Sequence, residues 1–216
     1  MNRGFPNGNL YRRAGSARSH RIRFSMSAVL IATTVLAGCA SSQLAELKSE
    51  DTDGLLVATF NVHYLSSRAT DMAWERREAA VLQVLREIDA DLIAFQEMET
   101  FGDGHVSNHN IQLDSLAGAF PQYGVSAVGD PAVYPSTQPI FYRKGLMEPL
   151  EQGYFFFSPT PDIIYSRPWH KRYPAFASWV RFRRISDGRT FYVFNVHTDA
   201  SSAPNRMKSA RLVRNR

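Results

Sequence analysis

Polar residues that can do chemistry stand at the ends of three apolar runs. The tetrapeptide Phe-Asn-Val-His occurs twice, and its copies end at His63 and His197, about 130 residues apart. Between them, the run DLIAFQE ends at Glu97. Each run is rich in β-branched or aromatic residues, which is typical of a buried strand with polar residues at its carboxyl end. The sequence therefore predicts amide, imidazole and carboxylate groups at strand ends.

Glu97 is the most informative of these residues. Open α/β sheets bind ligands at the carboxyl ends of their strands, and a carboxylate there is costly to desolvate without a positive partner. A hard divalent cation, which takes oxygen ligands, is one such partner. An exposed loop acid or an arginine-paired acid would explain an isolated Glu97 equally well. Because an Asn and a His end other predicted strands, we expect a ligand site instead.

The elements that position Glu97 follow a strand–helix–strand order. Residues 55–62 (LLVATFNV) and 91–97 (DLIAFQE) are predicted strands. Residues 71–89 between them have an amphipathic pattern, with Asp71 as the candidate N-cap of a helix. This order predicts a right-handed βαβ unit with parallel strands.

The rest of the chain has a mixed pattern of strands and helices. A hairpin of two alternating strands is predicted over 176–196, turning at Asp187-Gly188. A turn that contains Gly145 and Pro149 is predicted between two further strands. The remaining predicted elements are loops at 102–108 and 158–174, helices at 110–120 and from 205 onward, and strands at 123–128, 138–144 and 153–157.

The first 54 residues have the composition of a targeting segment. Six arginines and no acid precede an apolar run that is too short to cross a bilayer as a helix. The run ends in Leu36-Ala37-Gly38-Cys39, which resembles the bacterial lipobox, in which cleavage precedes an acylated cysteine. We therefore expect a lipoprotein signal peptide at 1–38, lipidated Cys39 with a polar tether at 39–54, and a domain at 55–216. The alternatives are an ordinary signal peptide and a chance apolar run.

Cys39 also bears on localisation and redox chemistry. As the only cysteine, it has no disulfide partner in the chain. Two acyl groups on Cys39 would attach the protein firmly to a membrane. We expect a lipid-anchored protein of the cell envelope, in the outer membrane if the cell is Gram-negative, or else a secreted protein.

The basic charge belongs mostly to the targeting segment. Of the 25 Lys and Arg residues, six precede Cys39, which leaves 19 against 20 acids in the remainder. The sequence pI of about 9.5 is therefore no indication of nucleic-acid binding. Residues 164–216 are rich in basic side chains and would either face phosphates or form a solvated surface.

The ordered segments TFNV, DLIAFQE, PIFYRKG and FNVHTD resemble the endonuclease/exonuclease/phosphatase superfamily. That superfamily includes apurinic endonucleases, deoxyribonuclease I, sphingomyelinases and inositol-polyphosphate phosphatases. The resemblance covers about Leu55 to Arg216. It implies an α/β fold in four layers, with two packed mixed β-sheets flanked by helices. It also implies a divalent-metal-dependent phosphoester hydrolase (a phosphodiesterase, nuclease or phosphatase) whose substrate is nucleic acid, a phospholipid headgroup or a sugar phosphate.

The resemblance gives the two Phe-Asn-Val-His copies different roles. It implies that Glu97 binds Mg²⁺ (or Mn²⁺), that Asn61 supports the metal site and catalysis, and that His197 contacts the scissile phosphate. His63 is expected to be a local structural residue. Weaker candidates for the site are Asn195, Tyr142, Arg143 and Asp199.

Two motifs of the superfamily do not occur in the sequence. One is of the Gly-Asp-Phe-Asn type, whose Asp and Asn orient the attacking water, and the other is of the Ser-Asp-His type, whose His completes the phosphate site. Pro174-Ala175 also stands where many bacterial relatives have Pro-Arg. We therefore expect a chain that is incomplete at its C-terminus, with an unfinished second sheet. The alternatives are an inactive relative that serves as a surface binding module and a structural lipoprotein with a coincidental resemblance.

Overall fold

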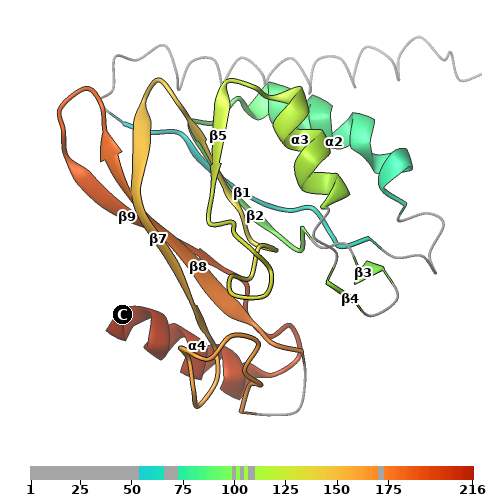
Figure 1. The fold of residues 1–216 in the computed structure, drawn as a ribbon, viewed down its shortest axis with the longest axis vertical. Coiled ribbons are helices and arrows are strands. Elements are labelled where there is room, and N and C mark those ends of the chain that lie inside the picture. The colour runs from blue at the N-terminus through green and yellow to red at the C-terminus, as the bar shows by residue number, and fades with distance from the viewer. Residues whose placement is uncertain (1–53, 66–72, 99–100, 103–104, 107–109, 170–172) are drawn as a thin grey trace, which may run out of the picture. The chain divides into compact units, whose positions relative to one another are not determined.

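The computed structural model describes residues 54–65, 73–98, 101–102, 105–106, 110–169 and 173–216 (Figure 1). All of them belong to the unit Leu44–Arg216. The elements are β1 (Val57–Asn61), α2 (Trp74–Ile88), β2 (Leu92–Gln96), β3 (Phe101–Gly102), β4 (His105–Val106), α3 (Ile111–Ala119), β5 (Tyr123–Ser126), β6 (Ile140–Arg143), β7 (Met147–Phe156), β8 (Phe176–Arg184), β9 (Thr190–Val196) and α4 (Ala203–Asn215). The predicted signal peptide, Cys39, the tether as far as residue 53 and the predicted N-cap Asp71 lie outside the described residues.

The first sheet has the strand order β1-β2-β6-β5. β1 and β2 are parallel, with Asn61 beside Gln96 at their carboxyl ends. β6 runs antiparallel to both β2 and β5. The predicted strand–helix–strand unit with parallel strands is confirmed, since α2 lies between β1 and β2 in the chain.

The second sheet has the order β7-β8-β9, and its described strands are all antiparallel. Of the two predicted sheets, the first is therefore mixed and the second is antiparallel in its described part. The tight turn between β8 and β9 reverses the chain, which only an antiparallel pair permits. Gly188 supplies the positive φ of 73° that this turn requires.

Pro149 lies within β7 and not in the turn predicted before it. The turn occupies residues 144–146, and β7 begins at Met147. The register of β7 against β8 shifts between Pro149 and Glu151. β7 is an edge strand of the described sheet, where a bulge tolerates a residue that has no N–H to donate. The sequence prediction gave Pro149 only its role in turns.

Three apolar clusters hold four layers together. α2 and α3 cover one face of the first sheet, and α4 packs against the second (Figure 1). The cluster between α2, α3 and the first sheet includes Trp74, Val81, Leu85, Leu116, Ile93, Phe95 and Phe141. The cluster between the sheets includes Leu92, Ile140, Met147, Val180 and Phe182. The cluster under α4 includes Phe155, Phe157, Ala177, Leu212 and Val213. The predicted four-layer α/β sandwich is confirmed for the described residues.

Alternation along the strands decides which side chains face the sheet interface. In β2, Ile93 and Phe95 face the helices, while Leu92 faces the second sheet. Successive residues of a strand point to opposite faces, so Gln96, the last residue of β2, also points between the sheets. In β9 the same alternation places the Asn195 side chain on the face that packs against the first sheet. Two buried amides therefore end two strands that face each other.

Candidate functional site

Glu97 leaves the end of β2 in a left-handed backbone conformation. Its φ is 56°, which costs a non-glycine residue about 1–3 kcal/mol. Backbone hydrogen bonds hold the chain on both sides, from Val62 N to Gln96 O at 3.1 Å and from Met98 N to Thr137 O at 3.1 Å. The surrounding structure thus fixes the direction in which this carboxylate leaves the sheet.

His197 leaves β9 at the same place. Its Nε2 lies 3.4 Å from Glu97 Oε1, and the two side chains are 37% and 21% exposed. That separation is long for a hydrogen bond and within the range of an ion pair when the imidazole is protonated. The two residues on which the sequence prediction depended most are therefore brought together, one from each sheet.

The surroundings of Glu97 decide between the explanations that its sequence left open. Most of the side chain is shielded from solvent, so Glu97 is not an exposed loop acid. Within the described part of the chain, its only ion-pair partner is His197, so it is not an arginine-paired acid. A largely buried carboxylate with so little compensation is typical of a ligand site.

Asn61 lies at the same edge of the first sheet as Glu97. It stands beside Gln96 in the β1–β2 register, and its Oδ1 accepts a hydrogen bond from His63 N at 2.8 Å. The Asn61 side chain is exposed. Its amide thus closes a local turn at the edge where Glu97 emerges.

His63 is held by local contacts in the first Phe-Asn-Val-His copy. Its φ is 59°, its ring stacks on Tyr64 at 4.5 Å, and Nδ1 lies 3.0 Å from Tyr64 O. The His63 carbonyl accepts hydrogen bonds from Arg77 Nη2 at 3.1 Å and from Gln112 Nε2 at 2.9 Å. These contacts tie the end of β1 to α2 and α3, in agreement with the structural role expected for His63.

Gln96 and Asn195 form a link that the sequence prediction missed. Gln96 Nε2 donates to Asn195 Oδ1 at 2.7 Å, and both side chains are buried. The sequence did indicate that Asn195 faces inward, because Asn195 lies on the same face of an alternating strand as Phe191 and Val193. Its partner was not predictable, because the alignment of one sheet on the other is not encoded locally.

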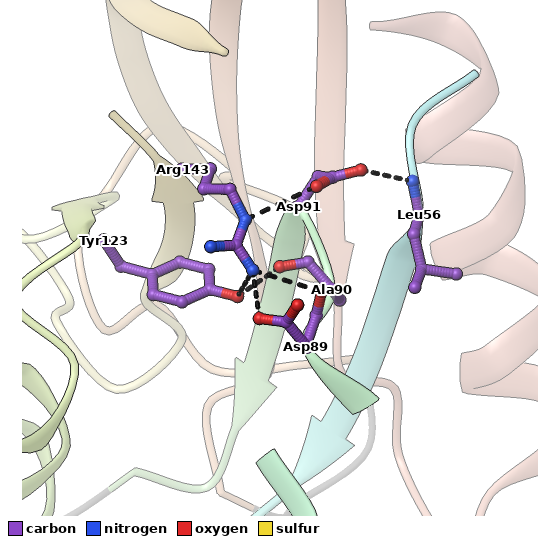
Figure 2. Close-up of polar contacts among 6 residues, drawn as sticks. All are labelled: Leu56, Asp89, Ala90, Asp91, Tyr123 and Arg143. Carbon is purple, nitrogen blue, oxygen red and sulfur yellow. Dashed lines mark hydrogen bonds and ion pairs between the residues drawn. The ribbon is translucent and has the colours of Figure 1, made fainter. Parts of the chain in front are cut away.

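Tyr142 and Arg143 lie away from this site, so their candidacy for it is wrong. β6 is antiparallel to β2, and Tyr142 stands opposite Leu92, at the beginning of β2. Four residues of strand, or roughly 13 Å, separate Leu92 from Gln96. Figure 2 shows Arg143 at that opposite edge, bonded to Asp89, Asp91 and Tyr123.

Asp199 lies in the loop before α4 and does not face Glu97 in any described contact. Its Oδ1 accepts from Ser201 N at 2.8 Å and Ser202 N at 3.0 Å, and its Oδ2 accepts from Asn205 Nδ2 at 2.8 Å. The hydrogen bonds from the Asn205 amide and from Ser201 N hold the pKa of Asp199 well below its ordinary value. Asp199 therefore fixes the loop that follows His197.

A surface hollow of about 440 Å³ lies at the other end of β9 from His197. It is lined by Leu55, Arg184, Arg189, Thr190 and Phe191. Both arginines form ion pairs with Asp187 within the hairpin. Because the hollow contains no acid or imidazole among its lining residues, we place the candidate site at Glu97 and His197 instead.

Glu97 fits a hard divalent cation as one ligand of a site completed by water and substrate. Mg²⁺ is usually held through one or two carboxylates and keeps several waters. In the described part of the chain, no group of three His, Cys, Asp or Glu side chains is placed to hold a metal. The oxygen donors at this edge are the Glu97 carboxylate and the Asn61 amide.

No helix among the described residues is long and apolar enough to cross a membrane.

No protein-family model and no curated protein matches the chain. Solved structures do match. An endonuclease/exonuclease/phosphatase from Bacteroides vulgatus is 25% identical, with a TM-score of 0.62 over 74% of this chain and 59% of that one. A protein of the same family from Bacteroides thetaiotaomicron is 28% identical, with a TM-score of 0.63 over 74% and 57%. The described domain has the endonuclease/exonuclease/phosphatase fold.

The endonuclease/exonuclease/phosphatase fold predicted from the ordered motifs is thus confirmed. A mannosyl-6-phosphatase from Bacteroides thetaiotaomicron VPI-5482 is also similar, at 28% identity and a TM-score of 0.62 over 75% of this chain and 58% of that one. The chain spans less than three fifths of the length of these three structures. These neighbours indicate phosphoester chemistry as the class of reaction to test.

Proposed function

We propose that this chain carries the site of a divalent-metal-dependent phosphoester hydrolase. The proposal depends on one observation, the 3.4 Å contact between Glu97 Oε1 and His197 Nε2 at the meeting point of two sheets. A carboxylate that binds a cation and an imidazole that donates to an anion are complementary neighbours on either side of a phosphate group.

In this proposal, Glu97 holds Mg²⁺ (or Mn²⁺). A bound cation would neutralise the negative charge on a phosphoryl oxygen. The positive charge also compensates a carboxylate that is only 21% exposed. The strained backbone at Glu97, held by flanking hydrogen bonds, keeps the carboxylate aimed in one direction.

His197 and Asn61 have separate roles in the same proposal. His197 Nε2 donates a hydrogen bond to a phosphate oxygen and so stabilises negative charge as it develops. Its partial exposure leaves the ring accessible to a substrate. Asn61 stands at the end of the neighbouring strand, where its amide orients the metal site or the phosphate.

Among the substrates that the sequence left open, we propose a sugar phosphate. The supporting observation is the similarity to a mannosyl-6-phosphatase at 28% identity. Nucleic acid and phospholipid headgroups contain the same phosphoester group, so an assay that offers all three classes discriminates among them.

The test compares the two histidine-containing copies in this chain extended by a C-terminal portion with the Gly-Asp-Phe-Asn-type and Ser-Asp-His-type motifs that the resemblance implies. Hydrolysis of mannose 6-phosphate, DNA and a phospholipid is measured with Mg²⁺ and with EDTA, and p-nitrophenyl phosphate and bis-p-nitrophenyl phosphate serve as chromogenic references. We expect Glu97→Gln and His197→Ala each to lower turnover by about 10²–10³. His63→Ala is the matched control and should change turnover far less.

Two results would overturn the proposal. One is an equal loss from His63→Ala and His197→Ala, since the two copies would then have the same role. The other is an extended wild-type chain without Mg²⁺-dependent hydrolysis. Retained Mn²⁺-dependent binding of mannose 6-phosphate would in that case favour a binding module.

We also propose that the protein is anchored to the cell envelope through Cys39. The support is the sequence Leu36-Ala37-Gly38-Cys39 and the absence of any other cysteine from the chain. Labelled palmitate should be incorporated by the wild type and not by Cys39→Ser, which should leave the membrane fraction. An unlabelled, soluble wild-type protein would contradict the anchor.

A further inference from the structure

Two buried amides, one from each sheet, meet directly behind the Glu97–His197 pair. Gln96 precedes Glu97, and Asn195 lies two residues before His197. Asn195 is 1% exposed and Gln96 is 7% exposed, and the hydrogen bond between them is 2.7 Å long. A direct polar link therefore joins the ends of β2 and β9 next to the site.

The surrounding carbonyl groups fix the orientation of this link. Asn195 Nδ2 lies 2.6 Å from Phe95 O, 3.2 Å from Gln138 O and 3.4 Å from Pro139 O. Because its donor side faces three acceptors, Asn195 must turn Oδ1 toward Gln96. Gln96 Nε2 also faces two other acceptors, Thr59 Oγ1 and Ala94 O, each at 3.0 Å. Both amides are therefore held in one direction by the strands around them.

Stability alone does not explain a pair of amides at this position. The net gain from a buried hydrogen bond is modest, because each group gives up hydrogen bonds to water on folding. Apolar side chains of the same size would fill the same space, although the Phe95 carbonyl would lose the donor that Asn195 Nδ2 supplies. What the amides add is direction, since a hydrogen bond fixes distance and angle more narrowly than an apolar contact does.

The first Phe-Asn-Val-His copy shows that the motif by itself does not bury its amide. Asn61 occupies the corresponding position, is exposed, and accepts a hydrogen bond from His63 N within its own turn. Asn195 instead reaches across to the other sheet. Only the copy whose histidine contacts Glu97 is joined to Gln96 through its asparagine side chain.

We infer that Gln96 and Asn195 are positioning residues, whose buried hydrogen bond sets the separation between the Glu97 carboxylate and the His197 imidazole. The inference rests on the proposed function, in which that separation sets how far the carboxylate that would hold the cation lies from the group that would contact phosphate. Sites built from two elements tolerate errors of only about 0.5 Å in such distances. Neither amide touches substrate in this arrangement.

The test replaces the amides by apolar side chains of nearly the same shape in the full chain without metal. In Gln96→Met/Asn195→Leu the packing volume is kept and the directed hydrogen bond is lost. The midpoint of urea unfolding reports stability. The ¹⁵N resonances of the His197 imidazole, identified by their loss in His197→Gln, report the contact with Glu97.

We expect a lower midpoint than in the wild type, because the Phe95 carbonyl loses the Asn195 donor, and a shift of the His197 resonances toward their positions in Glu97→Gln. Gln152→Met is the matched control, because Gln152 also connects β7 to the first sheet, through Ala127 N at 2.7 Å and Val128 O at 2.8 Å. It should leave the His197 resonances unchanged. Should the double variant not fold, Gln96→Met alone keeps Asn195 with its three carbonyl contacts and should shift the resonances in the same direction.

Unchanged His197 resonances in a folded double or single variant would overturn the inference. An equal shift in Gln152→Met would also overturn it, because any disturbance of the sheet interface would then have the same effect. The readout needs neither metal nor turnover. A failure of hydrolysis or of metal binding would therefore count against the proposed function while leaving this result standing.

Discussion

The first sheet has one polar cluster where β2 begins and another where β2 ends. The two clusters differ in how their charges are compensated. Where β2 begins, Arg143 binds the carboxylates of Asp89 and Asp91 and lies over the Tyr123 ring (Figure 2). Where β2 ends, Glu97 has His197 as its only ion-pair partner among the described residues. In the first cluster the charged groups pair with one another and hold the fold together. In the second cluster the Glu97 carboxylate is available to a ligand.

The Arg143 cluster ties several elements to one another. Tyr123 of β5 donates to Ala90 O, and Asp91 Oδ2 accepts from Leu56 N, just before β1, at 2.8 Å. Arg143 also donates to Asp89 O at 3.2 Å, at the end of α2. Burial raises the pKa of Tyr123, and the Arg143 charge offsets part of this rise. The cluster therefore fastens β1, β5, β6 and α2 around the start of β2.

The largest effect that separates the two edges is expected on stability. Arg143→Ala leaves two carboxylates without their cation, and such a loss destabilises a fully buried pair by 3–5 kcal/mol. Because the Arg143 side chain is 23% exposed, we expect a smaller loss of about 2 kcal/mol in the free energy of unfolding. Glu97→Gln should change it by less than about 1 kcal/mol, since little is paired there.

Urea unfolding of the full chain measures both values. Lys144→Ala is the control for Arg143, because it removes a neighbouring cation that is exposed and bonded only to Pro121 O among its described contacts. Equal losses from Arg143→Ala and Glu97→Gln would mean that both edges are structural. The start and the end of β2 would then no longer differ as a structural cluster and a ligand site.

A smaller, pH-dependent effect is expected at Asp199, beside His197. The folded pKa of Asp199 is depressed, so its stabilisation is fully present above the unfolded pKa of about 3.9 and is lost as the pH falls through the folded pKa. Asp199→Asn should therefore lower the urea midpoint at pH 7. The gap to the wild type should narrow as the pH falls from about 5 to about 2.

Ser202→Ala gives the matched control for Asp199. Ser202 Oγ accepts from Asn205 N at 3.3 Å at the start of the same helix but carries no titratable group. Its gap to the wild type should not depend on pH. A constant gap for Asp199→Asn as well would show that hydrogen bonding without charge explains the role of Asp199.

The sequence was sufficient to predict the strand ends of the site. Alternating or continuous apolar runs are local signals, so the positions of Glu97 and His197 at the ends of β2 and β9 followed from them. The ordered motifs then predicted the fold. What the pattern did not contain was the direction of β6 relative to β2. That direction places Arg143 at the opposite edge from Glu97.

The contacts between the sheets also lay beyond the sequence prediction. The alternation of β9 turns Asn195 inward, yet its partner depends on how one sheet lies over the other, a tertiary property. The same limit explains why Pro149 was not predicted to lie within a strand. A proline is tolerated there because β7 is an edge strand with a register shift. Local propensity identified the elements, and long-range pairing decided which polar residues meet.

The most direct test of the Glu97 site is a titration of the full chain with Mn²⁺, followed by the paramagnetic broadening of the His197 imidazole resonances. Because a cation on Glu97 lies beside His197, we predict broadening at substoichiometric Mn²⁺, reversal by excess Mg²⁺, and loss in Glu97→Gln. Broadening of the same extent in Glu97→Gln, or no broadening in the wild type, would contradict a divalent-cation site at the end of β2.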